Sequence, residues 1–173
     1  MKNENTAADG QIGIVEQSTR TPFGPLVPPR TGYLDSSTAR ELKERLRLAG
    51  LKPTRPRVGI SWLLFGGGDR HVTAEVLHEE ARRHKLFISL ATVYNTLHQF
   101  EEAGLIRQVA LFGGKLWYDT TTGPHCHYFN EDTQEVFDIP VHCAPCLEAP
   151  VAPEGMEVIG VDVVVRVRKR QTD

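Results

Sequence analysis

Apolar residues recur at helical spacing in four segments, which predicts four amphipathic helices within about 65 residues. The predicted helices run from about 38 to 49, from about 54 to the glycines at 66–68, from 73 onward, and from 89 to the glycine at 104. Glycine commonly ends a helix, and Pro56 falls in a first turn, where its missing N–H costs little. Roughly the first 35 residues are polar and then rich in Pro and Gly, so we assign no packed element there.

The fourth predicted helix has two contrasting faces. Ser89 is placed as its N-cap, and an apolar stripe follows at Leu90, Val93, Leu97 and Phe100. The opposite face is small, polar and uncharged and comprises Ala91, Thr92, Asn95 and Gln99. An ordinary solvated face more often carries Lys and Glu, whereas small hydrogen-bonding groups suit the edges of base pairs in a major groove.

A hairpin is predicted after the fourth helix. The runs 105–111 and 115–119 are strand-like, and Phe112-Gly-Gly114 between them is a turn signal. Helices that end in a polar-faced helix, followed by a two-stranded ribbon, are the layout of a winged helix, which inserts one helix in the major groove and lays the wing along the backbone. The alternative is a helical protein-interaction module that ends in a hairpin.

Beyond Thr122 the pattern predicts three strands. They cover Tyr128–Phe129, residues 136–139 and residues 156–168, and the last carries Ile159, Val161, Val163, Val165 and Val167 on one face. Such a sheet is small for a core of its own, and pairing with a second copy would cover it. The predicted fold class is α+β: an N-terminal arm (1–35), a winged-helix DNA-binding domain (36–122) and a small α/β dimerisation domain built on a three-stranded sheet (123–173).

Charge and composition narrow the possible partners. The net charge of −2 argues against a uniformly basic protein, yet the segment from Arg40 to Arg57 contains seven basic residues and only two acidic ones. That local excess could follow a phosphate backbone, with Lys52, Arg55 and Arg57 as candidates, or belong to a solvated helix face. Neither a membrane-spanning run nor a signal peptide is evident, so we expect a cytoplasmic protein without a membrane partner. Three cysteines do not suggest a disulfide framework.

Metal-type ligands gather at the domain junction, in Pro124-His-Cys-His127. In an extended strand His125 and His127 point to one side and Cys126 to the other. Two imidazoles do not complete a site, and His71, Asp119 and Asp138 are the residues that folding could add; an exposed histidine pair is the alternative.

A second cysteine-containing segment follows the domain junction. Cys143-Ala-Pro-Cys146 could be part of a zinc site, a redox pair or a loop with unligated thiols. A general base beside an open pocket and a Gly-rich phosphate loop are both lacking from the pattern, so we do not expect an enzyme.

Five motifs in register give the chain a family resemblance. Arg70-His-Val-Thr-Ala-Glu75, Ala91-Thr-Val-Tyr94, Glu102-Ala-Gly-Leu105, Gly113-Gly-Lys115 and His125-Cys-His127 resemble the ferric uptake regulator family, over about residues 34–170. Leu51-Lys-Pro-Thr-Arg55, Leu105-Ile-Arg-Gln-Val109 and other segments are most similar to its iron response regulator branch in alphaproteobacteria. The resemblance implies a repressor or dual regulator of iron and haem genes, or alternatively a peroxide-sensing or other metal-sensing regulator.

The resemblance also implies roles for single residues. His71, Asp119, His127 and Asp138 match the regulatory metal ligands, with Asp in place of Glu twice. His125 matches a second metal site whose aspartate is replaced by Cys126, and in the iron response branch His125 and His127 are candidate haem ligands. The expected cofactor is therefore haem or a divalent metal (Fe, Mn or Zn) at this interdomain cluster. A structural four-cysteine zinc site is not expected, because Asn130 and Thr133 stand where one cysteine pair would be.

DNA is the partner that the resemblance implies for the fourth helix. Tyr94, Asn95 and Thr92, with Ser89 at the helix start, are the candidates for base contacts. The expected target is double-stranded DNA carrying an AT-rich inverted repeat, bound by a homodimer or a higher oligomer.

Overall fold

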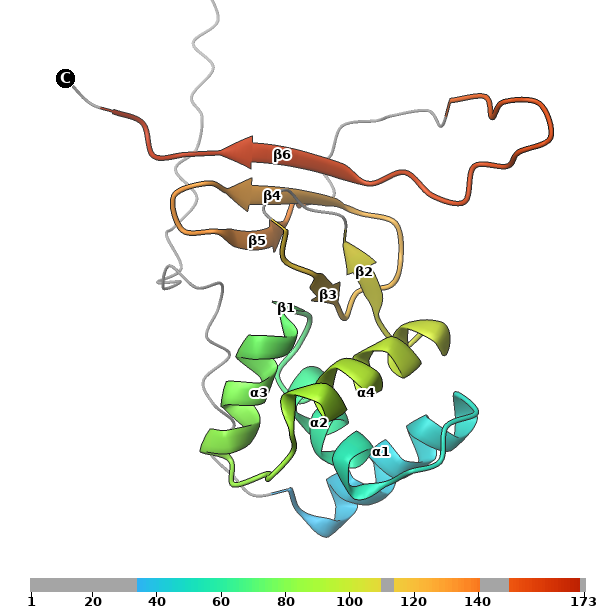
Figure 1. Cartoon of the computed structure of the whole chain (residues 1–173), viewed down its shortest axis with the longest axis vertical. Helices are drawn as coiled ribbons and strands as arrows, with labels where there is room; N and C mark the ends of the chain where they lie inside the picture. The colour runs from blue at the N-terminus through green and yellow to red at the C-terminus, as the bar shows by residue number, and fades with distance from the viewer. Residues whose placement is uncertain (1–33, 110–113, 141–149, 172–173) are drawn as a thin grey trace, which may run out of the picture.

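The computed structural model describes residues 34–109, 114–140 and 150–171, which form four helices and six strands (Figure 1). The helices are α1 (Ser36–Leu48), α2 (Arg55–Phe65), α3 (Ala74–Arg83) and α4 (Leu90–Glu102). The strands are β1 (His71–Val72), β2 (Arg107–Val109), β3 (Trp117–Asp119), β4 (Cys126–Asn130), β5 (Glu135–Asp138) and β6 (Val163–Val167). The predicted α+β class is confirmed. None of the helices among these residues has the length and apolar composition that crossing a membrane requires.

Side-chain caps set where the helices begin. The Ser89 hydroxyl accepts a hydrogen bond from the backbone N–H of Thr92, and Thr73 caps α3 in the same way through Val76. The predicted starts of α2, α3 and α4 are confirmed to within one residue. Helix α1 begins two residues before the predicted position, because the carboxylate of Asp35 accepts from the N–H groups of Ser37 and Thr38.

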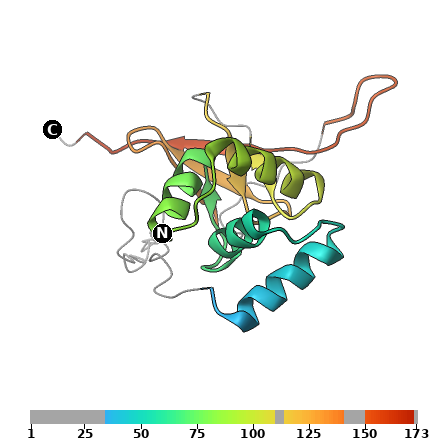
Figure 2. The ribbon, with the colours of Figure 1, turned by 60° about the horizontal axis from the view of Figure 1, so that its bottom comes forward.

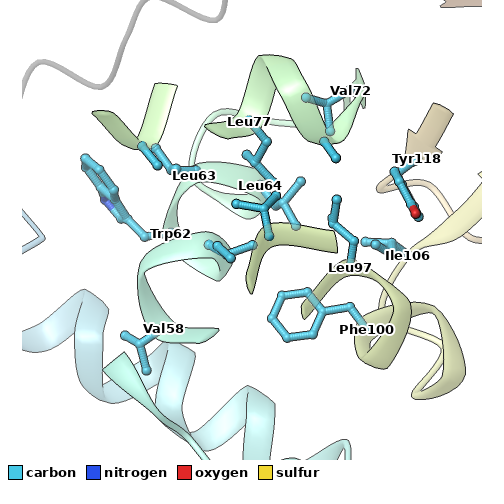
Figure 3. Close-up of a cluster of buried hydrophobic side chains, with 14 of the residues drawn as sticks. Val58, Trp62, Leu63, Leu64, Val72, Leu77, Leu97, Phe100, Ile106 and Tyr118 are labelled. Atoms are coloured by element: carbon cyan, nitrogen blue, oxygen red, sulfur yellow. The ribbon is translucent and has the colours of Figure 1, made fainter. Parts of the chain in front are cut away.

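The core lies where the four helices pack against the sheet formed by β1, β2 and β3 (Figure 3). Val93, Leu97 and Phe100 of α4 are fully buried, which confirms the predicted apolar stripe. They pack with residues from every other helix and from β1 and β3, among them Leu46, Ile60, Leu64, Val72, Leu77 and Tyr118. Burial of these large side chains fixes α4 against the other helices and leaves its opposite face outward.

The wing is a three-stranded sheet in the order β1-β3-β2, with both pairings antiparallel. The predicted hairpin is present in shorter form, and residues 110–113 of its turn lie outside the described residues. Strand β1 was not predicted, because two residues are too few to show an alternating pattern. This strand places His71 directly opposite Asp119.

The second sheet has the order β5-β4-β6, with β4 antiparallel to β5 and parallel to β6. The predicted last strand, residues 156–168, is wrong in extent, since only Val163–Val167 pairs with β4. Ile159 ahead of it is 93% exposed and Val165 within it is 37% exposed. In Figures 1 and 2, β6 lies at the side of the molecule opposite α1, and the described helical core includes no residue of this strand.

Candidate metal centre and DNA-binding face

Strand register makes the candidate ligands cross-strand neighbours in each of the two sheets. In the wing sheet, Asp119 on the central strand lies opposite His71 on one side and Arg107 on the other. In the second sheet, His127 on the central strand lies opposite Asp138. His125 immediately precedes β4, and its imidazole contacts both Asp119 of the wing sheet and Asp138 of the second sheet. The cluster therefore forms where the two sheets meet, at the predicted domain junction.

One carboxylate oxygen is the centre of this cluster. Asp119 Oδ2 lies 3.0 Å from His125 Nε2, 3.4 Å from His127 Nε2 and 3.6 Å from His71 Nε2. Ligand atoms of these four residues all lie within 4.8 Å of one another. On the solvent side, Asp138 Oδ1 lies 3.1 Å from His125 Nε2 and 3.3 Å from His71 Nε2. Imidazole nitrogen and carboxylate oxygen are ligands that Zn²⁺, Fe²⁺ and Mn²⁺ accept.

Neighbouring backbone groups orient two of these side chains for metal binding. The Nδ1–H of His125 donates to the carbonyl oxygen of Gly123 at 2.8 Å, which leaves the Nε2 lone pair facing the cluster. The N–H of Thr121 donates to Asp119 Oδ1 at 2.8 Å and so directs Oδ2 inward. Within the described residues, His71 Nε2 and His125 Nε2 are buried without a hydrogen bond of proper geometry. A bound cation would satisfy these nitrogens, so the residues present fit a metal ion.

The electrostatics of Asp119 also favour a bound cation. Burial alone would raise the pKa of this carboxyl, but the imidazoles of His127 and His71 beside it outweigh burial and hold the pKa far below its ordinary value. Asp119 is therefore a buried carboxylate whose negative charge is directed at three imidazole nitrogens.

The structure brings the predicted metal ligands together and corrects two expectations. His127 is 0% exposed, so the alternative of an exposed histidine pair is wrong. His125, which we assigned to a second site through the family resemblance, lies in the same cluster as His71 and His127. Cys126 is half-buried and takes no part in the cluster, as the alternation along the strand predicted.

The segment where the family has a cysteine pair carries Asn130 and Thr133 in this chain. Asn130 and Thr133 form the turn between β4 and β5: Asn130 Oδ1 accepts from the N–H groups of Asp132 and Thr133. Cys143 and Cys146 lie outside the described residues.

Sequence reasoning missed Arg107 as a member of the site. Its guanidinium Nε lies 3.2 Å from Asp119 Oδ2, and its Nη2 lies 3.5 Å from His127 Nε2. The hairpin register, which pairs Arg107 with Asp119, could have revealed it had the strand ends been placed correctly.

The predicted DNA-contacting residues share the outer side of α4 and the start of α2. Asn95 and Ser89 are exposed, and the guanidinium of Arg57 donates to Oε1 of Gln99 on α4 through Nε and Nη2. Lys52 and Arg55 are exposed, and the carbonyl oxygen of Lys52 accepts from Arg57 Nη1, so the three predicted phosphate contacts lie at or just before the start of α2, where Arg57 contacts α4. The Tyr94 hydroxyl donates to the carboxylate of Glu75 on α3, which lowers the pKa of Glu75 and raises that of Tyr94.

Comparison with known proteins identifies the family. The ferric uptake regulator family matches residues 48–165. The ferric uptake regulation protein of Pseudomonas putida is 35% identical over 128 residues, which is 73% of this chain and 96% of that protein. The structure of the ferric uptake regulator from Pseudomonas aeruginosa with manganese is 31% identical, has a TM-score of 0.58 and covers 75% of this chain and 98% of its own. The Vibrio cholerae ferric uptake regulator shares the fold, with a TM-score of 0.58 at 24% identity over 73% of this chain and 98% of that one. The chain therefore belongs to the ferric uptake regulator family and is a metal-responsive transcriptional regulator rather than an enzyme.

Proposed function

We propose that this regulator controls iron homeostasis genes and that its effector is a divalent metal ion. His71, Asp119, His125 and His127 hold the ion, and Asp138 completes the set from the solvent side. The convergence of three imidazole Nε2 atoms on Asp119 Oδ2 carries the proposal, because imidazole nitrogen and carboxylate oxygen are ligand types that Zn²⁺, Mn²⁺ and Fe²⁺ accept. The manganese in the structure of the Pseudomonas aeruginosa relative supports the choice of a divalent ion.

Haem is the second ligand considered for this site. Its iron could be bound by His125 or His127, the histidines that the iron response branch implies. The His127 imidazole is fully buried, and the two sheets enclose its Nε2. A porphyrin could reach that nitrogen only if the sheets separated, whereas a single ion needs no such movement. The burial of His127 therefore favours a metal ion as the direct effector.

DNA binding is assigned to α4 and the start of α2. In this proposal, Asn95, Thr92, Tyr94 and Ser89 approach base edges while Lys52, Arg55 and Arg57 contact phosphates. A homodimer would place two copies of α4 on the halves of an AT-rich inverted repeat. The hydrogen bonds from Arg57 to Gln99 support this arrangement, because they fix a phosphate-binding cation to the outer side of α4.

The test measures ligand binding and DNA binding in one preparation. Metal-free protein is titrated with Mn²⁺, Zn²⁺ and haem in turn, and the affinity of each form for an AT-rich inverted repeat is then measured. We expect a divalent metal, and not haem alone, to change the DNA affinity of the wild type and to leave that of His127→Ala unchanged. Binding should also weaken with salt by roughly 0.9 log units per log unit of salt for each phosphate contact. DNA affinity that responds to none of the ligands would refute the sensor assignment.

Peroxide sensing is the alternative function that the cluster's composition favours. Three imidazoles around one site would place oxidisable side chains next to a bound Fe²⁺. Mass spectrometry of the Fe²⁺-loaded protein after peroxide treatment distinguishes the two functions. Oxygen added to His71, His125 or His127 at low peroxide would favour this alternative, and unmodified histidines would exclude it.

A further inference from the structure

Arg107 brings a positive charge into the centre that we assign to a metal ion. Its side chain is 22% exposed and extends from β2 toward the cluster. The guanidinium contacts the two ligands that lie deepest in the site: Nε is 3.2 Å from Asp119 Oδ2, and Nη2 is 3.5 Å from His127 Nε2. A cation of the chain itself thus occupies part of the environment that a metal ion would use.

The contact to His127 and a bound metal exclude each other. An imidazole Nε2 has one lone pair, and a guanidinium N–H can only donate, so in the tautomer whose Nε2 accepts from Nη2 this contact occupies the lone pair that a metal ion would need. Asp119 Oδ2 can accept from Arg107 and still bind a metal, but the guanidinium and the ion then repel each other at short range. Metal binding must therefore move Arg107 at least away from His127.

Asp162 offers the displaced guanidinium another partner. Arg107 Nη1 already lies 3.3 Å from Asp162 Oδ1, in the segment that leads into β6. Asp162 is 55 residues further along the chain and immediately precedes β6 of the second sheet, whereas Arg107 lies in β2 of the wing sheet. The carboxylates of Asp119 and Asp162 both contact this guanidinium, and Asp138 lies on the solvent side of the histidine cluster, so negative charge remains for a divalent cation.

We propose that Arg107 is an internal competitor of the metal ion, which holds Asp119 and His127 in the metal-free protein and shifts onto Asp162 when metal binds. This inference rests on the metal site proposed above and adds a means by which metal occupancy changes the contact between the wing and β6. Arg107 sets the metal concentration at which the regulator responds, because each binding event must displace it.

Metal affinity of charge variants tests the competition. Affinities for Mn²⁺ and Zn²⁺ are measured against a chelating dye for the wild type, Arg107→Gln and Arg107→Lys. Arg107→Gln should bind metal more tightly, by on the order of tenfold, because a nearby positive charge is removed. Arg107→Lys keeps the charge and should stay close to the wild type. Arg82→Gln, which removes an exposed arginine on α3, should also leave the affinity unchanged and controls for net charge. Unchanged or weaker binding by Arg107→Gln would overturn competition, because a residue that only supports Asp119 would give that result.

Asp162→Asn tests the second half of the proposal. Without this carboxylate the displaced guanidinium has a poorer partner, so metal binding should weaken severalfold while the melting temperature of the metal-free protein changes little. Equal affinities of Asp162→Asn and wild type would overturn the transfer to Asp162. Circular dichroism of each metal-free variant shows that it is folded. A wild type that binds neither metal would instead refute the proposed metal site, so the two failures are distinguishable.

Discussion

At the scale of single residues, Asp119 and Asp138 contribute differently to the same centre. Asp119 is fully buried, and its Oδ2 lies within 3.6 Å of three imidazole nitrogens. The side chain of Asp138 is 41% exposed and contacts the cluster from its solvent side. The ligand types could be predicted from the sequence, but their unequal depth could not, because depth depends on which strand of each sheet is central.

This difference predicts unequal effects of removing each charge. Asp119→Asn should abolish metal binding, because it removes the carboxylate oxygen shared by all three imidazoles. Asp138→Asn should only weaken binding, since water can replace an exposed ligand. Calorimetric titration with Zn²⁺ and Mn²⁺ checks both, and equal losses in the two variants would contradict the assigned roles.

Asn95 provides the residue-scale test of DNA recognition. Asn95→Ala should cost about 1–3 kcal/mol of binding free energy on specific DNA if the amide makes a bidentate base contact. Its effect on random DNA should be much smaller, whereas Lys52→Ala should weaken both complexes alike, because phosphates carry no sequence information. Fluorescence anisotropy with two DNA duplexes measures these losses. Equal losses on both duplexes for Asn95→Ala would remove it from base recognition.

At the scale of elements, local signals predicted the helices better than the strands. Thr73 and Ser89 cap their helices with their own side chains, so the signal and its cause lie within a few residues. Strand limits depend instead on distant partners. The valine alternation extends ahead of Val163, but β6 begins only where β4 runs alongside it. Arg107 escaped prediction for the same reason, since its role depends on register rather than on its neighbours in sequence.

The Asp35 cap of α1 predicts a pH-dependent stability. Hydrogen bonds from the hydroxyl of Ser37 and from Thr38 hold the pKa of Asp35 well below its ordinary value of 3.8. A group whose pKa is lower in the folded state makes its full contribution to the free energy of unfolding above its pKa in the unfolded chain. It loses that contribution as the pH falls through its pKa in the folded protein. The melting temperature of Asp35→Ala should therefore be lower than that of the wild type by a constant difference between about pH 7 and pH 5. Below about pH 4 this difference should become smaller. Asp35→Asn keeps a neutral acceptor and should show a smaller, pH-independent margin. A margin for Asp35→Ala that grows on acidification would contradict the cap's contribution.

At the scale of the whole molecule, β6 leaves apolar surface where a second copy could pair. Val165 is 37% exposed, and Val161 and Ile159 ahead of it are exposed as well. Lone exposed apolar residues are common, but Val165 lies on an edge strand and the other two lie in the segment that leads into it, and the unpaired backbone groups of an edge strand favour further pairing.

A charge on this edge should separate the subunits of the proposed dimer. Val165→Asp should shift the protein toward monomer and weaken binding to an inverted repeat more than to a half-site, because a dimer needs both halves. Val76→Asp makes the same change at an exposed position on α3 and should leave the dimer intact. Light scattering after size exclusion measures the mass. A Val165→Asp protein that remains dimeric would place the interface elsewhere.

The position of β6 in the chain also bears on the order of events during synthesis. Every proposed metal ligand, from His71 to Asp138, precedes Val163 in the chain. Because proteins are made from the N-terminus, the nascent chain presents the complete ligand set before the last strand is translated. A newly made molecule can therefore acquire its ion before it has the edge at which we expect it to meet a second subunit.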